Sequence, residues 1–95
     1  MKHDYHDATL KALTAFWEAG TVELIFRLST EVSADMTIRV SGASEIRWAR
    51  AFPWGRSVSV NSLEVQEVPS GYRLEVEMQS GDRISIVGKE ILEAE

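Results

Sequence analysis

Residues 72–78 read Tyr72-Arg73-Leu74-Glu75-Val76-Glu77-Met78, an unbroken alternation of apolar and charged side chains. Successive side chains of a β-strand point to opposite faces, so the four apolar residues would share one face and the three charged residues the other. A helix would scatter the same apolar residues around its circumference. The stretch therefore predicts a strand with one buried face and one face in water.

Turn-forming residues on both sides of this strand extend it into a meander. Pro69-Ser70-Gly71 precedes the strand and Ser80-Gly81 follows it. Proline fixes φ at the first corner of a turn, and glycine tolerates the positive φ that tight turns require. Residues 63–87 are therefore predicted to form three antiparallel strands.

The same alternation recurs in other stretches of the chain, at residues 22–28, 36–40, 45–52 and 57–60. We expect an all-β fold of six to eight mostly antiparallel strands, arranged as a meander-containing sandwich or a partly open barrel. The inward-facing positions predict a core made of Leu13, Trp17, Val22, Leu24, Phe26, Leu28, Ile38, Val40, Ile46, Trp48, Val58, Val60, Val65, Tyr72, Leu74, Val76, Ile84 and Ile86.

Residues 8–18 fit two structures. As a helix they would have Asp7 as N-cap and Gly20 just past the end, and their Ala, Leu and Lys content favours that choice. As a strand they would pair with residues 21–28 through a hairpin whose Gly20 has a left-handed conformation. The first alternative makes the fold α+β, with residues 8–18 helical; the second keeps it all-β.

The composition is that of one small globular domain. The chain has 95 residues, 44% of them hydrophobic and 26% charged, so residues 1–95 are expected to form a single β-rich domain with frayed ends at 1–5 and 93–95. It has no cysteine, which excludes disulfides, zinc–thiolate sites and thiol catalysis. No apolar run approaches the roughly 20 residues of a membrane span. We expect a cytoplasmic protein with no membrane contact and no cofactor.

The charges are unevenly distributed. Residues 36–62 have a balance of +3, whereas residues 1–35 and 63–95 have balances of −3 and −5. The basic segment mixes arginine with aromatic residues, which are typical anchors of protein interfaces. Nucleic acid is not expected as a partner, because the net charge is −5. The predicted interaction surface, for a protein partner or a second copy in a homo-oligomer, consists of Arg47, Arg50, Trp54 and Arg56.

The sequence contains few residues suited to catalysis or metal binding. His3, His6 and Asp7 have metal-ligand chemistry, but they lie at a free end and the chain has no further histidine to complete a site. They are only a weak metal candidate, and no metal is expected. The two histidines are far in sequence from the serines at 57, 59 and 62, so no nucleophile–base pair is evident. We therefore expect that the protein is not an enzyme.

Two stretches resemble small bacterial β-rich domains of unknown function. His6-Asp7-Ala8-Thr9-Leu10, with residues 17–22, is similar to the N-terminal hairpin of such proteins, in which a His-Asp-Ala or His-Asp-Ser sequence begins the first strand. Residues 53–60 are similar to their later half. The resemblance implies that residues 8–17 are a strand. Some toxin-neutralising immunity proteins begin in a similar way.

The leading functional hypothesis is a non-enzymatic protein-interaction module of a bacterial cytoplasmic protein. One alternative is a toxin-immunity protein that covers a basic toxin with acidic surface. Another is a small-ligand-binding β domain with an apolar pocket near Trp48, Trp54 or Tyr72.

Overall fold

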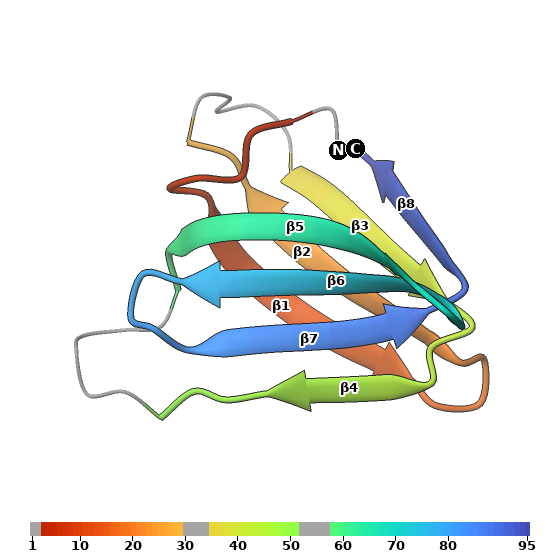
Figure 1. The fold of residues 1–95 in the computed structure, drawn as a ribbon. Coiled ribbons are helices and arrows are strands. Elements are labelled where there is room, and N and C mark those ends of the chain that lie inside the picture. The colour runs from red at the N-terminus through yellow and green to blue at the C-terminus, as the bar shows by residue number, and fades with distance from the viewer. Residues whose placement is uncertain (1–2, 30–34, 52–57) are drawn as a thin grey trace.

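The computed structural model describes residues 3–29, 35–51 and 58–95. In these residues eight strands form two four-stranded antiparallel sheets, which pack as a sandwich (Figure 1). No helix within these ranges is long and apolar enough to cross a membrane. The strands are β1 (Thr9–Phe16), β2 (Thr21–Arg27), β3 (Asp35–Ser41), β4 (Glu45–Trp48), β5 (Val60–Val68), β6 (Gly71–Met78), β7 (Arg83–Gly88) and β8 (Glu90–Ala94).

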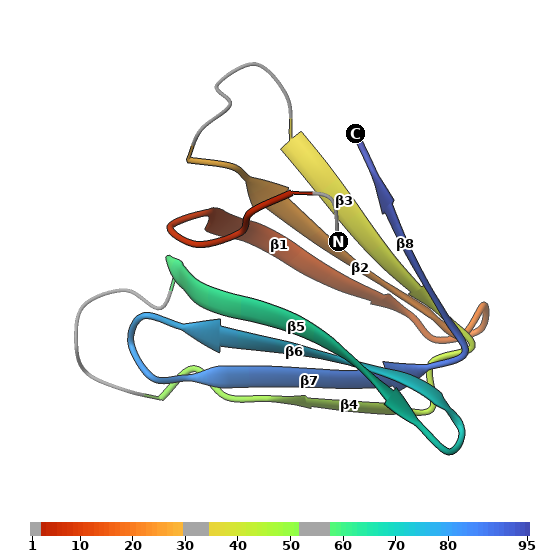
Figure 2. The ribbon, with the colours of Figure 1, turned by 45° about the horizontal axis from the view of Figure 1, so that its top comes forward.

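The first sheet has the order β1-β2-β3-β8 and the second the order β4-β7-β6-β5. The second sheet contains the predicted meander, because β6 pairs with both β5 and β7. Figure 2 shows the two sheets as layers that meet where β7 leads into β8. Only Lys89 lies between these two strands, and its N–H donates to the carbonyl of Ser41 in β3 at 2.9 Å.

Residues 9–16 form a strand, so the all-β prediction is confirmed and the helical alternative is wrong. Local propensity favoured a helix, but β1 pairs with β2 along its whole length, and tertiary pairing overrides propensity. Gly20 closes the hairpin with a φ of 69°, and its N–H donates to the carbonyl of Phe16 at 2.9 Å. A β-bulge between Leu10 and Ala12 lets Leu10 and Leu13 both face the core.

The core lies between the sheets and contains most of the residues predicted for it. Four predictions were wrong: the exposed fractions are 94% for Trp17, 64% for Trp48, 40% for Val65 and 37% for Tyr72. Trp17 lies in the hairpin turn, and the other three lie in or beside edge strands, where the facing sheet does not cover them fully. The list of predicted core residues omitted the buried side chains of Tyr5, Ala8, Met36, Met78 and Val87, although the alternation in residues 72–78 had placed Met78 on the buried face.

Tyr5, before β1, and β8, near the C-terminus, contact each other in the structure. Tyr5 is buried, and its ring packs edge-on against Phe26 with centroids 5.0 Å apart. Residues 90–94 form β8 at the edge of the first sheet, paired with β3. The Tyr5 hydroxyl donates to Glu93 in that strand at 2.5 Å.

Candidate functional site

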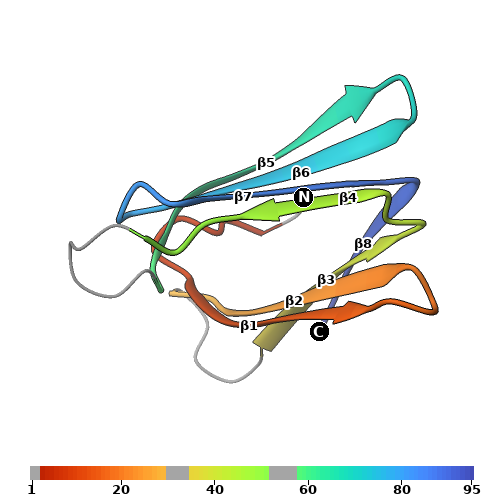
Figure 3. The same ribbon diagram turned by 90° about the horizontal axis from the view of Figure 1, so that it is seen from below.

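One side of the sandwich is bordered by two edge strands, β1 of the first sheet and β4 of the second. Figure 3 views the molecule from this side, which we call the open side. In β4, Ile46 is half-buried and packs against the core, and Trp48 lies on the same side of the strand because side chains alternate. Trp48 is too near the end of the sheet to be covered, and 64% of its surface is exposed.

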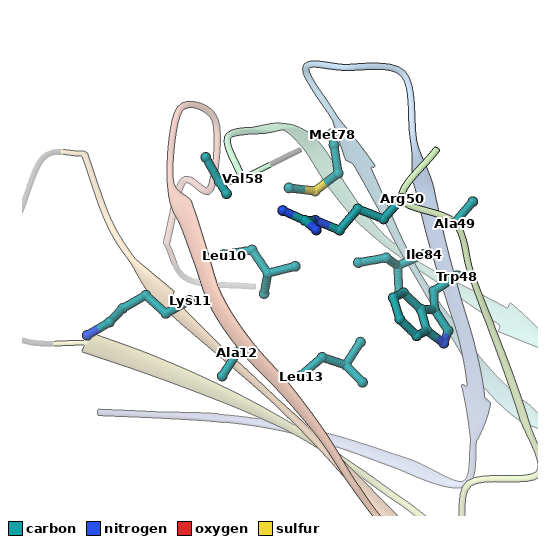
Figure 4. A pocket seen from close by; sticks show the side chains of 10 residues that line it. All are labelled: Leu10, Lys11, Ala12, Leu13, Trp48, Ala49, Arg50, Val58, Met78 and Ile84. Carbon is teal, nitrogen blue, oxygen red and sulfur yellow. The ribbon is translucent and has the colours of Figure 1, made fainter. Parts of the chain in front are cut away.

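A cavity of about 340 Å³ opens between β1 and the end of β4 (Figure 4). Leu10 and Leu13 line it from β1, and Trp48 and Ile84 line it from the second sheet. The side chain of Arg50 extends across this cavity toward β1 (Figure 4). The cavity therefore combines an apolar wall with one guanidinium group.

A second cavity, of about 440 Å³, lies at the other end of the open side. It is lined by Phe16 and Trp17 at the end of β1 and by Ala43 and Ile46 around the start of β4. Phe16 is 46% exposed and Trp17 is 94% exposed. Together the two cavities make the open side a largely apolar surface with three exposed aromatic side chains.

The strands that border the open side have free edges in the described part of the chain. The start of β1 is joined to the segment before β5, because Leu10 N–H donates to the Val58 carbonyl at 2.8 Å and Thr9 bridges Ser59. Beyond Leu10, no backbone hydrogen bond joins residues 11–15 to any described residue outside β2. β4 likewise pairs only with β7 among the described strands. Such edges can accept a further strand.

The predicted interaction residues do not form one surface. Arg47 lies on the outer face of the second sheet, with Nε 3.5 Å from Glu45 Oε1. Arg50 does not share that face, because it lines the open side with Trp48. Trp54 and Arg56 lie outside the described residues.

The basic middle of the sequence is also divided between the two sheets. Arg39 lies on the first sheet, where Nη2 is 2.6 Å from Glu23 Oε2. Arg47 lies on the second sheet beside a polar cavity of about 400 Å³ whose lining includes Glu64, Glu75 and Glu77. Here Glu77 accepts hydrogen bonds from Arg83 at 2.9 Å and Asn61 at 2.8 Å. The described residues of this segment, 36–51 and 58–62, therefore present no continuous basic face.

The weak metal candidate is not assembled. His3 Nδ1 is 3.4 Å from Glu93 Oε2, whereas His6 Nδ1 is 2.8 Å from the carbonyl oxygen of Asn61. Asp7 accepts a hydrogen bond from Gln79. In residues 3–29, 35–51 and 58–95, no group of three or more His, Asp or Glu side chains could hold a metal ion.

Two perturbed groups lie near the N-terminus, away from the open side. The hydrogen bond with the Asn61 carbonyl raises the pKa of His6, and the negative charge of Asp7 raises it further. Burial raises the pKa of the Tyr5 phenol well above its ordinary range, and the hydrogen bond to Glu93 acts in the same direction. Each shift is explained by contacts that hold the N-terminal segment in place.

Asp82 is a buried carboxylate that sequence analysis did not single out. It is 1% exposed; Oδ1 accepts from Ala51 N–H at 3.0 Å and Oδ2 from the Ser80 hydroxyl at 3.0 Å. These bonds tie the chain after β4 to the β6–β7 turn. Asp82 thereby helps to fix the position of Arg50 and the first cavity.

Sequence reasoning identified Trp48 as a core residue and missed Phe16 as a surface residue. Phe16 and Trp17 are consecutive, so strand alternation alone puts one of them on each face. The available signal is the position of the two residues in the chain. Phe16 ends the edge strand β1, and Trp17 is the first residue of the hairpin turn that follows it. An aromatic pair at that place indicates exposed apolar surface.

No protein-family model matches this sequence, and no curated protein matches it either. The fold is similar to that in the crystal structure of an uncharacterized protein from Neisseria gonorrhoeae. The TM-score is 0.74 at 14% sequence identity, over 96% of this chain and 93% of that one. The comparison shows a shared fold and names no function, in agreement with the resemblance to uncharacterised bacterial β-rich domains.

Proposed function

We propose that this domain is a non-enzymatic interaction module that binds another protein chain along its open side. The observation that carries the proposal is the exposure of Phe16, Trp17 and Trp48 beside two apolar cavities. Aromatic side chains at such positions are typical anchors of protein interfaces, because each buries a large apolar area when a partner covers it. A partner that covers them would remove their apolar surface from water, and each Å² buried would stabilise the complex by about 25 cal/mol.

The free edges of β1 and β4 support the same proposal. An extended segment that pairs with a sheet edge gains main-chain hydrogen bonds, and its alternate side chains enter pockets beside that edge. The open side offers both features, since the two cavities lie next to β1 and β4.

The contrast with the opposite side of the sandwich adds to this support. There, the N-terminal segment bridges the two sheets: Asp7 N–H donates to the Val60 carbonyl in β5 at 2.8 Å, and Tyr5 bonds Glu93 in β8. That side is covered by the N-terminal segment, whereas the described residues leave the open side uncovered and accessible to a partner.

Site-specific photo-crosslinking in the native host tests the proposal. The photoreactive residue p-benzoylphenylalanine would replace Trp48 in one strain and Leu92 in another. Leu92 is a matched control because it is 53% exposed on an edge strand, β8, of the first sheet.

We expect one discrete adduct from position 48 and none from position 92. The purified adduct partner should bind the wild-type domain, and Trp48→Ser should weaken that binding at least about tenfold. Equal adduct yields at the two positions, or no adduct at position 48, would contradict the proposal. The expected cytoplasmic location belongs to the same proposal, and fractionation of the host cells checks it.

A further inference from the structure

The chemistry of β4 specifies what kind of chain fits its free edge. Four strands lie at sheet edges in the described residues: β1, β4, β5 and β8. The charged residues of β5 and β8 are all glutamate, and β1 carries only Lys11. Antiparallel self-pairing of β5 or β8 would therefore bring only like charges together, which is destabilising. β4 is different, since Glu45 and Arg47 lie on one face of the strand.

The backbone of β4 restricts the register in which a further strand can pair. Ala49 N–H donates to the Arg83 carbonyl at 3.2 Å, in the same register as the Arg47–Ser85 and Glu45–Val87 pairs. Hydrogen-bonded pairs alternate along an antiparallel ladder. The N–H and C=O groups of Ile46 and Trp48 consequently face away from β7, toward the free edge.

A second copy of the chain meets both conditions in one register. If two β4 strands pair antiparallel about Ile46, the outward backbone groups of Ile46 bond their symmetry equivalents. Glu45 of each copy then lies opposite Arg47 of the other, which gives two cross-strand pairs of opposite charge. If the two strands were instead centred on Arg47, the Arg47 side chains of the two copies would lie opposite each other. That register would also need the backbone N–H and C=O groups of Arg47, which already bond β7.

The same register places the exposed tryptophan against an apolar surface. Trp48 of one copy lies opposite Ser44 of the other, and Ser44 lines the cavity of about 440 Å³ together with Phe16, Trp17 and Ile46. Each copy would thus cover part of the other's open side. A two-fold axis repeats every contact, so one favourable pair becomes two.

From these constraints we infer that the partner is a second copy of this chain, joined through antiparallel β4 strands centred on Ile46. The inference rests on the proposed function, because it names the occupant of the open side. The two four-stranded sheets that contain β4 become one sheet of eight strands in the dimer.

Charge reversal at the two positions tests the inference by sedimentation equilibrium. Glu45→Arg and Arg47→Glu should each weaken the wild-type dimer at least about tenfold, because like charges then face each other twice. An equimolar mixture of the two variants should form a heterodimer close to wild type in affinity, and so should the double variant with itself. Glu90→Arg, the same reversal on the edge strand β8, should leave the dimer unchanged. Circular dichroism would confirm that each variant is folded.

A wild-type protein that stays monomeric at about 100 µM would overturn the inference, as would a mixture that fails to restore association. Neither result by itself removes the proposed function, because a position-48 adduct with a different protein would still support it. An adduct of twice the chain mass, lost in Glu45→Arg and regained when both variants are expressed together, would support both.

Discussion

Tyr5 and Glu93 are 88 positions apart in the sequence, and the Tyr5 hydroxyl donates a hydrogen bond of 2.5 Å to Glu93 Oε2. The bond ties the segment before β1 to β8, the edge strand of the first sheet. The Tyr5 ring simultaneously packs on Phe26, so a polar and an apolar contact fix the same side chain.

Replacing Tyr5 with phenylalanine should lower the free energy of unfolding by about 1–2 kcal/mol, because Glu93 loses a donor in a partly buried place. Urea unfolding at pH 7 measures the change. Tyr72→Phe is the control, since Tyr72 is exposed, and it should change stability by less than about 0.5 kcal/mol. Equal losses in the two variants would show that the hydroxyl of Tyr5 adds nothing.

The raised pKa of Tyr5 predicts a loss of stability in alkali. The folded protein holds the phenolic proton more tightly than the unfolded chain does. The stability that this proton contributes is fully present below about pH 10, the pKa of tyrosine in the unfolded chain. It declines as the pH rises above that value. The wild type should therefore lose stability above about pH 10 more steeply than Tyr5→Phe, as measured by urea unfolding at several pH values. Parallel pH profiles would contradict this expectation.

His6 should titrate above its ordinary pKa near 6.5. The charged imidazole donates to the Asn61 carbonyl and lies 3.6 Å from Asp7, and both contacts favour the protonated form. The contribution of protonated His6 to the stability of the fold is fully present below about pH 6.5. It is lost as the pH rises through the raised pKa of His6. Asp7→Asn should lower the His6 pKa in an NMR titration, and asparagine tolerates the positive φ of 65° at that position. An unchanged His6 pKa in the variant would rule out the contribution of Asp7.

Gly88 should not tolerate a methyl group. A Cβ there would lie 2.4 Å from Val40 Cγ1 and 2.9 Å from the Ser41 carbonyl oxygen. Gly88→Ala should therefore destabilise the protein by about 1–3 kcal/mol through overpacking. Gly20→Ala is the matched comparison: it has open space around its Cβ and a φ of 69°, so only the left-handed conformation opposes it, at about 1–2 kcal/mol. A Gly88→Ala protein as stable as wild type would contradict the packing at this corner.

Asp82→Ala should free the chain that follows β4. The change removes the buried carboxylate that accepts the part-buried hydrogen bond from the Ala51 N–H, at a cost of about 1 kcal/mol. Hydrogen exchange at the Ala51 amide should accelerate more than exchange in β2, which would separate a local release from general destabilisation. Uniform acceleration across the protein would contradict a local role for this carboxylate.

Much of the fold could be predicted from side-chain alternation, because one face of each central strand is buried. Residues 22–27 lie in β2 and residues 72–78 lie in β6. Burial alternates strictly through β2 and from Arg73 to Met78 in β6, whereas Tyr72 is exposed. The pattern fails at β-bulges, because the inserted residue moves the side chains that follow it to the opposite face of the sheet. Such bulges follow Leu10 in β1 and Val60 in β5, and neither is evident in the sequence.

Alternation also says which face a side chain occupies but not how deeply it is buried. Trp48 lies on the inward side of β4 as predicted, yet the facing sheet ends beside it. β8 was missed because its glutamate-rich sequence has low strand propensity. Its backbone pairing with β3 stabilises the strand in spite of that low propensity. The open side could not be predicted, since it depends on which strands become edges.

The corner at Gly88 and Lys89 joins the two sheets through what is nearly one bent strand. β7 is an inner strand of the second sheet, and β8 pairs with β3 in the first. Loss of order in one sheet would therefore disturb a strand of the other sheet, because β7 and β8 are directly connected. Melting should accordingly be one cooperative event, in which fluorescence and circular dichroism report a common midpoint.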